Sequence, residues 1–192
     1  AQQLFTAANL ADMADLLAAQ GVHVAYGGRI FALQPSIRRY LRGTYLGDSL
    51  EEAVESVSQL AHTSTPTPYA PPLPSEMLEM LRRFRASLPL IMAFIWQRLQ
   101  TETLPKMAMS GYGYPSAIYF LSRDIEAAMR LGSMEILGDE LQWARMLLLH
   151  HKIPTETLQH FVHLYCEAVT SLLGEAGQMA AEWLTRLEAT LA

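Results

Sequence analysis

The sequence predicts a mainly α-helical protein in which the C-terminal fragment of an α/β domain precedes a larger helical domain. Three observations predict this organisation. Apolar residues recur at helical spacing throughout residues 76–192. Only one run, VHVAY over residues 22–26, has the β-branched and aromatic composition of a strand. Residues 63–75 are rich in Pro, Ser and Thr and form a stiff linker, so the α/β fragment is expected over residues 1–62.

The fragment begins with a predicted amphipathic helix over residues 4–20, which Gly21 ends. Its apolar side is expected to pack on the rest of the fragment, opposite two aspartates. The expected apolar residues are Leu4, Leu10, Met13, Leu16 and Leu17, and the aspartates are Asp12 and Asp15.

The strand that follows runs directly into a Gly-Gly pair. A short helix is expected over residues 37–41, and a longer one over residues 49–62 opens with the capping box Ser49-x-x-Glu52. Because one strand cannot form a sheet alone, we expect these residues to be the tail of a domain whose other strands precede Ala1.

After the linker, six helices are expected. Pro89 occupies a first-turn position and starts the second of them, and the segment LPKMAMSGYGYP forms a loop before the third. The expected ranges are residues 76–86, 89–101, 116–131, 134–151, 154–173 and 175–191.

The composition limits the classes of protein. Hydrophobic residues make up 51% of the chain and charged residues 17%, which suits helices that bury several faces or enclose a large apolar ligand. No apolar run reaches the roughly 18 residues of a membrane span, and no signal peptide is evident. The single cysteine, Cys166, suits a reducing cytoplasm, and the net charge of −5 argues against a nucleic-acid surface. We expect a cytoplasmic protein that binds neither membrane nor nucleic acid.

The helix over residues 116–131 carries the polar pair that folding alone explains least. Arg123 and Asp124 are adjacent in the middle of an otherwise largely apolar helix, and burying either charge without a partner would cost several kcal/mol. Ala127 and Ala128 follow one turn later and leave room beside the charges. The alternative interpretation is a solvated polar stripe on an ordinary helix.

The segment LSRDIEAAMRLGSMEILGD, which contains this pair, resembles the chromophore helix of phycobiliproteins. The matching residues are Arg123, Asp124, Arg130, Gly138 and Asp139. The resemblance continues through KIPTETLQHFVHLYCEAVTSLLGEAGQMAAEWLTRLEATL and covers roughly residues 76–191. It implies a globin-like, phycobiliprotein-like six-helix domain that binds a linear tetrapyrrole, or bilin.

The resemblance also implies roles for residues. Asp124 would accept hydrogen bonds from the central pyrrole nitrogens, and Arg123 with Arg130 would pair with the propionates. Leu121 occupies the position of the cysteine that links the chromophore, so the bilin is expected to be held noncovalently. The basic residues that the family places shortly upstream are missing from SGYGYPSA. The other expected bilin contacts are Trp143, Tyr112, Tyr114, Tyr119, Leu158 and Phe161, of which Trp143, Leu158 and Phe161 could equally be core residues.

The first region has a resemblance of its own. The run GVHVAYGGRIFALQPSIRRYLRGTYLGDSLEEAVESV resembles the C-terminal part of the Rossmann-like cobalamin-binding domains of light-responsive B12 regulators. The resemblance implies that Tyr26, Gly27 and Gly28 lie beneath the nucleotide tail of cobalamin, because glycines let a bulky ligand approach the end of a parallel strand. No Asp-x-His-x-x-Gly motif occurs, and His23 lies mid-strand, so this chain alone is not expected to bind cobalamin tightly.

Together the two regions resemble the photocobilins, photoreceptors that pair B12 with a bilin. The resemblance implies a light sensor that holds biliverdin or a related tetrapyrrole, with adenosylcobalamin bound in the intact protein, and we expect a homodimer or a higher homo-oligomer. No catalytic triad, P-loop or pair of catalytic carboxylates points to an enzyme.

Two alternatives remain open. One is a haem-binding globin-type sensor, with a histidine as the proximal ligand. The other is a ligand-free helical module that dimerises beside a B12 switch. The histidines concerned are His150, His151, His160 and His163, and no Cys or Glu-x-x-His partner at ligand spacing supports a metal site.

Overall fold

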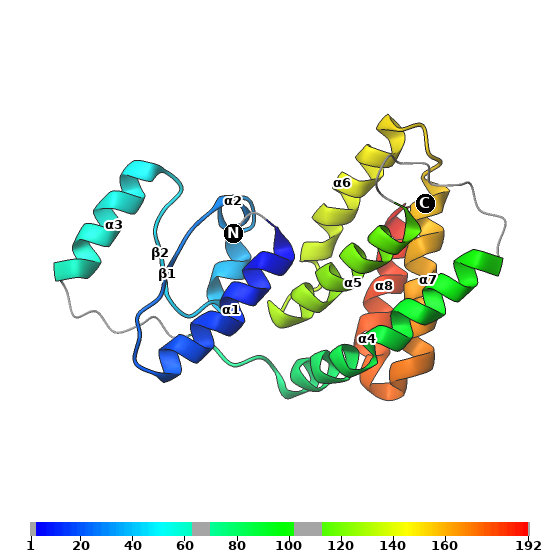
Figure 1. Ribbon diagram of the computed structural model, residues 1–192, viewed down its shortest axis with the longest axis horizontal. Coiled ribbons are helices and arrows are strands. Elements are labelled where there is room, and N and C mark those ends of the chain that lie inside the picture. Colours follow the sequence, from blue (N-terminus) through cyan, green and yellow to red (C-terminus); the bar gives the residue numbers. More distant parts are fainter. Residues whose placement is uncertain (1–2, 63–69, 102–112, 192) are drawn as a thin grey trace. The chain divides into compact units, whose positions relative to one another are not determined.

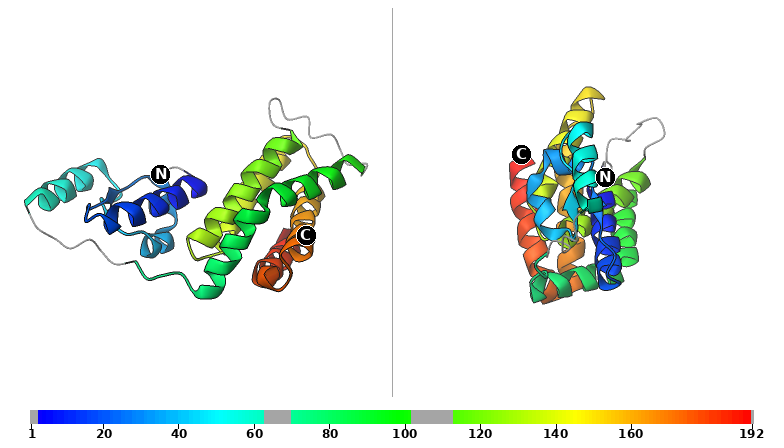
Figure 2. Two further views of the ribbon diagram at one scale, coloured as in Figure 1. Left: turned by 60° about the horizontal axis from the view of Figure 1, so that its bottom comes forward. Right: turned by 90° about the vertical axis from the view of Figure 1, so that its left-hand side faces the viewer.

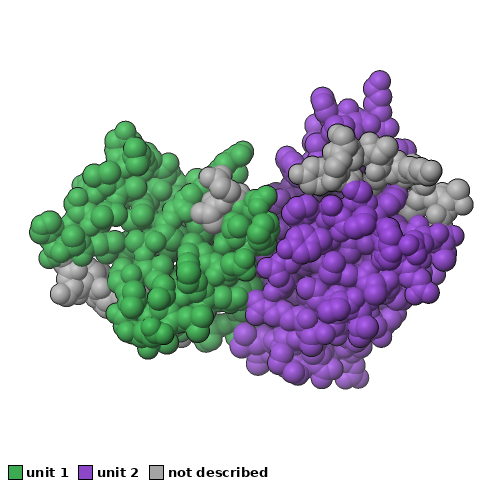
Figure 3. Space-filling view, viewed as in Figure 1, with its two compact units in different colours: residues 1–74, 130–133 green, residues 75–129, 134–192 purple. Residues whose placement is uncertain are grey.

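The computed structural model of the chain describes residues 3–62, 70–101 and 113–191. Over these residues the protein is mainly helical, as the sequence predicts, with eight α-helices, two 3₁₀ helices and one two-stranded sheet (Figure 1). No helix in the described ranges is long and apolar enough to cross a membrane. The chain forms two compact units, shown in different colours in Figure 3. The first unit comprises Ala1–Pro74 and Arg130–Ser133, and the second comprises Ser75–Met129 and Met134–Ala192.

The first unit begins with α1 (Leu4–Ala19), and Gly21, with φ of +74°, follows its C-terminus. The predicted apolar side of this helix is wrong except for Leu4, which is fully buried. Met13 is 50% exposed and Leu16 is 69% exposed, whereas the helix buries an alanine stripe instead. Alanine side chains are small and let neighbouring backbones approach closely. The buried residues are Leu4, Ala7, Ala8, Ala11 and Ala14.

Two short parallel strands follow α1. Strands β1 (Ala25–Tyr26) and β2 (Thr44–Tyr45) pair with Tyr26 opposite Tyr45. The sequence predicts the first strand over too many residues and misses the second, because a strand of two residues is too short to show a pattern. The connection contains α2 (Arg29–Leu33) and the 3₁₀ helix η1 (Pro35–Tyr40), which replaces the short helix expected over residues 37–41.

The last helix of residues 1–74, α3 (Leu50–His62), buries none of its residues. Its apolar stripe is open, with Leu50 77%, Val54 61% and Val57 50% exposed. Figure 1 shows α3 standing away from α1 and α2. The predicted capping box is half formed, because the Glu52 amide donates to Ser49 Oγ at 3.1 Å while the Glu52 carboxylate accepts from the Asp48 amide.

The second unit opens with α4 (Ser75–Thr101), one helix where the sequence predicts two. The predicted break at Pro89 is therefore wrong, and the described residues of this unit hold five α-helices instead of six. Proline lacks an N–H and crowds the carbonyl of the preceding turn, which bends a helix without necessarily ending it. Figure 2 shows α4 changing direction along its length.

The remaining helices follow the predicted order. They are α5 (Tyr114–Arg130), α6 (Ile136–His150), α7 (Glu156–Leu173) and α8 (Gln178–Leu191), with the 3₁₀ helix η2 (Gly174–Gly177) before the last. Helix α7 packs against both α4 and α8 and forms the centre of the core (Figure 1). Its fully buried residues include Val162, Tyr165 and Val169. The predicted loop before α5 lies mostly outside the described residues.

Candidate functional site

The carboxyl group of Asp124 lies in the middle of α5, partly buried. It forms no hydrogen bond or ion pair with the residues that the structure describes. Burial, and to a lesser extent the negative charge of Glu140 on α6, raises the pKa of Asp124 to about 7. A carboxyl group without a cationic partner at this depth favours its protonated form, or a ligand that brings N–H donors or positive charge.

Arg123, the neighbour of Asp124, is only partly satisfied by the protein. Its Nη1 donates to a carboxylate oxygen of Glu126 at 3.0 Å, whereas its Nε is enclosed and has no hydrogen-bond partner. The other oxygen of Glu126 accepts from Nε of Arg85 on α4 at 2.7 Å. The carboxylate of Glu126, whose side chain is only 11% exposed, is therefore shared by the guanidinium groups of Arg85 and Arg123.

Arg130, the second arginine expected to bind a propionate, is engaged within the first unit. Its side chain is 9% exposed, and its guanidinium group pairs with the carboxylates of Asp12 and Asp15 on α1. Two acids on one buried guanidinium group leave it little capacity for an acidic ligand. We therefore do not include Arg130 in the proposed site.

A buried hydroxyl pair lies behind this face of α5. Tyr165 of α7 is completely buried, and its hydroxyl group donates to the backbone carbonyl oxygen of Ile118 at 2.6 Å. The hydroxyl group of Ser122 lies 2.8 Å from that of Tyr165. Both hydroxyl groups have a partner within the protein. The buried contact with Tyr165 therefore accounts for Ser122, and no role in ligand binding is needed to explain it.

The expected aromatic and apolar contacts fall into two groups. Trp143 is 65% exposed and Tyr119 50% exposed, so both side chains are open to a ligand or a partner. Leu158 and Phe161 are buried in the core of the second unit. Tyr114 is partly buried, which raises the pKa of its hydroxyl group, and Tyr112 lies outside the described residues.

The sequence alone assigns no site role to Glu126 or Glu140 and predicts that Arg85 belongs to a solvated basic face of its helix. Glu126 and Arg85 form the shared ion pair, and Glu140 adds its charge to that of Asp124. Burial and the charge of Asp139 raise the pKa of Glu140 as well. On α6, Arg145 also has an enclosed Nε without a partner. The sequence carries no signal for the contact between Arg85 and Glu126, because it joins two helices whose packing no local pattern fixes.

A shallow hollow of about 420 Å³ lies elsewhere in the second unit, between α4 and α7. Arg98 of α4 donates to Glu167 of α7 across it at 2.9 Å. None of the residues expected to contact a bilin lines it. Its lining consists of Phe94 and Arg98 from α4 and of His163, Cys166, Glu167, Thr170 and Ser171 from α7.

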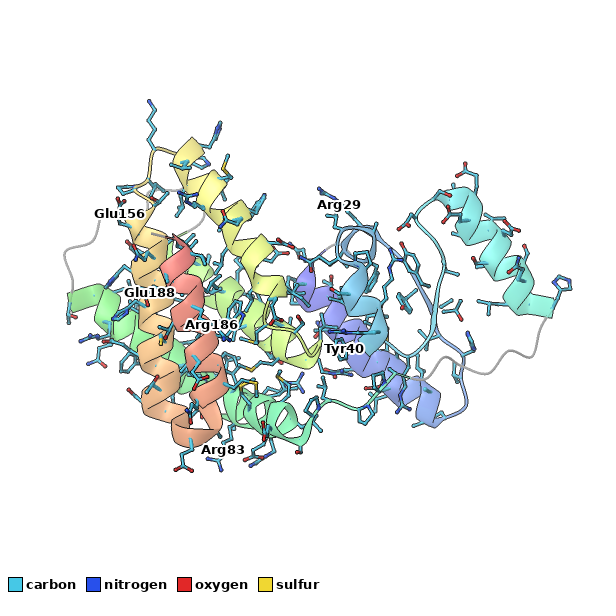
Figure 4. All side chains as sticks on the ribbon, turned by 180° about the vertical axis from the view of Figure 1, so that it is seen from behind. Arg29, Tyr40, Arg83, Glu156, Arg186 and Glu188 are labelled. Atoms are coloured by element: carbon cyan, nitrogen blue, oxygen red, sulfur yellow. The ribbon has the colours of Figure 1, made fainter. Side chains whose placement is uncertain are left out.

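Cys166 lies on α7 and faces α8. Its thiol lies 3.2 Å from Thr185 Oγ1 and 3.5 Å from the carbonyl oxygen of Ala181. Beside it, His163 approaches two acids, Glu167 on its own helix and Glu188 on α8, the latter labelled in Figure 4. Among the described residues no group of three or more His, Cys, Asp or Glu side chains is placed to hold a metal ion.

The residues expected beneath cobalamin lie at the carboxyl end of β1. Tyr26 is buried, and its hydroxyl group donates to the carbonyl oxygen of Arg38 at 3.3 Å, so the side chain belongs to the core of the first unit. Gly28, with φ of +118°, and the adjacent Gly27 are the residues open to a ligand. Gly47, with φ of +109°, follows β2 at the same edge and was missed. His23 lies before β1 and pairs with Thr44 at 2.9 Å.

Comparison with known proteins adds no assignment. No protein-family model matches the chain, and no curated protein matches it either.

Proposed function

We propose that the second unit binds a linear tetrapyrrole of the biliverdin type without a covalent bond and that the protein senses light through it. The observation that supports this most is Asp124, a partly buried carboxyl group with no partner among the described residues. The central pyrrole nitrogens of a protonated bilin supply both the N–H donors and the positive charge that such a carboxylate needs.

Arg123 supports the same ligand from the next position along α5. Its enclosed Nε has no partner, and a propionate is the kind of group that a guanidinium group binds with two hydrogen bonds. Leu121 occupies the place of a linking cysteine and is itself buried, so the bilin would be held by packing and polar contacts alone. The protein would tune the photochemistry of the chromophore through charge and hydrogen bonds.

In the intact protein the first unit would contribute to a cobalamin-binding domain, and an excited bilin would signal to the cobalamin. Two adjacent glycines at the carboxyl end of β1, Gly27 and Gly28, support this part of the proposal, because backbone without Cβ atoms can approach a large ligand.

A specific observation favours a second function, a ligand-free module that self-associates. The outer side of α6 exposes three large apolar residues, which is typical of an interaction surface. They are Trp143 at 65%, Met146 at 64% and Leu149 at 50% exposure.

Co-expression of the chain with a haem oxygenase that makes biliverdin separates the candidates. The bilin proposal expects a purified protein with red absorbance and no zinc-dependent fluorescence on a denaturing gel, because the chromophore is not covalently attached. A colourless, well-folded product that dimerises supports the self-association module instead, and a Soret band supports the haem alternative. Either of these results overturns the bilin proposal.

A further inference from the structure

The ion pair with Glu126 occupies only part of the guanidinium group of Arg123. Glu126 is 8% exposed and lies between Arg123 on its own helix and Arg85 on α4, at 3.0 Å and 2.7 Å. Arg123 uses one nitrogen for this contact and leaves its enclosed Nε without a partner. The guanidinium group is thus held by an acid of the protein but is not saturated by it.

An acidic ligand that reaches Arg123 meets this internal acid. Two carboxylates on one guanidinium group repel each other at short range, so the ligand and Glu126 compete for Arg123. If Glu126 lost Arg123 and had no other cation nearby, its buried negative charge would be unpaired, and the fold would be strongly destabilised. Arg85 removes this obstacle, because its Nε holds the other oxygen of the same carboxylate.

We infer that Glu126 is an internal counter-ion that competes with the propionate of the bilin for Arg123, and that Arg85 sets the strength of this competition from α4. This inference rests on the proposed bilin function. It assigns positioning roles to two residues outside the motif of α5: Glu126 holds the guanidinium group in place before the ligand arrives, and Arg85 lets Glu126 release it.

The quantity that tests the inference is the preference for a free propionate. It is the dissociation constant of biliverdin dimethyl ester divided by that of biliverdin, because the ester keeps the pyrroles and removes both negative charges. A charge-assisted hydrogen bond contributes roughly a ten-fold preference or more.

Three variants change this preference in different directions. Arg123→Gln is expected to reduce it to near unity. Glu126→Gln removes the competing charge while its amide oxygen can still accept from Arg85, so the preference is expected to rise by roughly ten-fold over the unmodified chain. Arg85→Gln leaves Glu126 with Arg123 as its closest cation, so the preference is expected to fall several-fold, by about 3- to 10-fold.

Arg186→Gln and Glu182→Gln are the matched controls. Both residues are exposed on α8, where Figure 4 labels Arg186, and Glu182 accepts a hydrogen bond from Gln178 of the same helix. Each is expected to leave the preference unchanged.

The outcomes distinguish a failure of the role inferred for Glu126 from a failure of bilin binding itself. If Glu126→Gln weakens binding of biliverdin and its ester equally, Glu126 is only structural and the inference is overturned while the bilin proposal stands. A fall in preference in Glu126→Gln overturns it as well. If the unmodified chain binds neither compound, the proposed function fails and the inference fails with it.

Discussion

The hydroxyl group of Tyr165 on α7 donates a hydrogen bond to the backbone carbonyl oxygen of Ile118 on α5 at 2.6 Å. Ser122 lies one turn further along α5, 2.8 Å from the same hydroxyl group, and its side chain is also fully buried. This contact ties α5, which carries Asp124, to the central helix of the second unit. The position of the candidate site therefore depends on it.

Tyr165→Phe is expected to lower the free energy of unfolding of the second unit by about 1–2 kcal/mol. The ring still fills its space, but Ser122 and the Ile118 carbonyl lose a partner, and Ser122 can recover only by bonding to that carbonyl four residues earlier. Urea unfolding followed by tryptophan fluorescence measures the change, because Trp96, Trp143 and Trp183 all lie in the second unit. Tyr119→Phe, at a site that is 50% exposed, should change it by less than about 0.5 kcal/mol; equal losses would contradict the prediction.

Gly132→Ala is expected to destabilise the first unit more than Gly21→Ala does. Both glycines have positive φ, +66° and +74°, so both alanine variants carry a similar backbone strain. A Cβ at Gly132 would lie 2.6 Å from the ring of Tyr40 and 2.9 Å from Leu73, whereas one at Gly21 meets nothing within 4 Å. The additional loss at Gly132 should be about 1–3 kcal/mol.

Hydrogen exchange of the Thr44 and Leu46 amides measures this difference, because both donate to residues at β1 in the first unit. Equal acceleration of exchange in the two variants would show that the ring of Tyr40 moves aside freely.

Substitutions on the open stripe of α3 are expected to cost little. Val57 is 50% exposed, so Val57→Thr should change the free energy of unfolding by less than about 0.5 kcal/mol. Ile37→Thr in the same unit places a hydroxyl group at a position with no exposure and should cost about 2–4 kcal/mol. Denaturation followed by circular dichroism compares the two. A large loss at Val57 would mean that the stripe is covered in solution, by another polypeptide or a second copy.

The sequence predicts the helices well and their contacts poorly. The period of apolar residues places α5, α7 and the start of α1 within about two residues of their positions in the structure, because a helix is a local pattern. Errors arise where two interpretations are both locally allowed. Pro89 can start a helix or bend one, and α1 offers both a leucine side and an alanine side to the core.

The candidate site shows the same division. Arg123 and Asp124 stand out in the sequence because two adjacent charges interrupt an apolar helix. Among the described residues, the Nε of Arg123 and the carboxyl group of Asp124 have no hydrogen-bond partner. Arg85 and Glu126 are 41 positions apart, so their contact depends on how α4 packs on α5 and no spacing rule reveals it. Arg130 matches the motif equally well, yet it is taken by acids more than a hundred positions earlier in the chain.

Asp124→Asn is expected to stabilise the ligand-free protein increasingly as pH rises. Burial and the charge of Glu140 raise the pKa of Asp124 from 3.8 to about 7, so between these values the folded chain keeps a proton that the unfolded chain has released. The stability of the native chain therefore falls as pH rises through this window, and the loss is complete above pH 7. Asparagine cannot ionise, so the variant should gain about 2–3 kcal/mol on the native chain from pH 5 to pH 8, because about two pH units of this window lie above pH 5.

Urea midpoints at several pH values test this gain. Glu182→Gln, at an exposed carboxyl group of α8, is the control and should follow the native chain at every pH. A gain for Asp124→Asn that is the same at pH 5 and pH 8 would contradict a raised pKa.

With biliverdin bound, Asp124→Asn is expected to harm the protein, because it weakens the contact with the chromophore. The asparagine removes the negative charge that balances the protonated pyrroles, so the red band should weaken and shift to shorter wavelength. Cys166→Ala is the discriminating partner variant, because Cys166 lines the hollow between α4 and α7, a second place that a ligand could occupy. Absorbance spectra of the two variants after co-expression with a haem oxygenase decide between the sites. Loss of colour only in Asp124→Asn supports a noncovalent bilin beside α5, whereas loss only in Cys166→Ala would place a thiol-linked chromophore in the hollow.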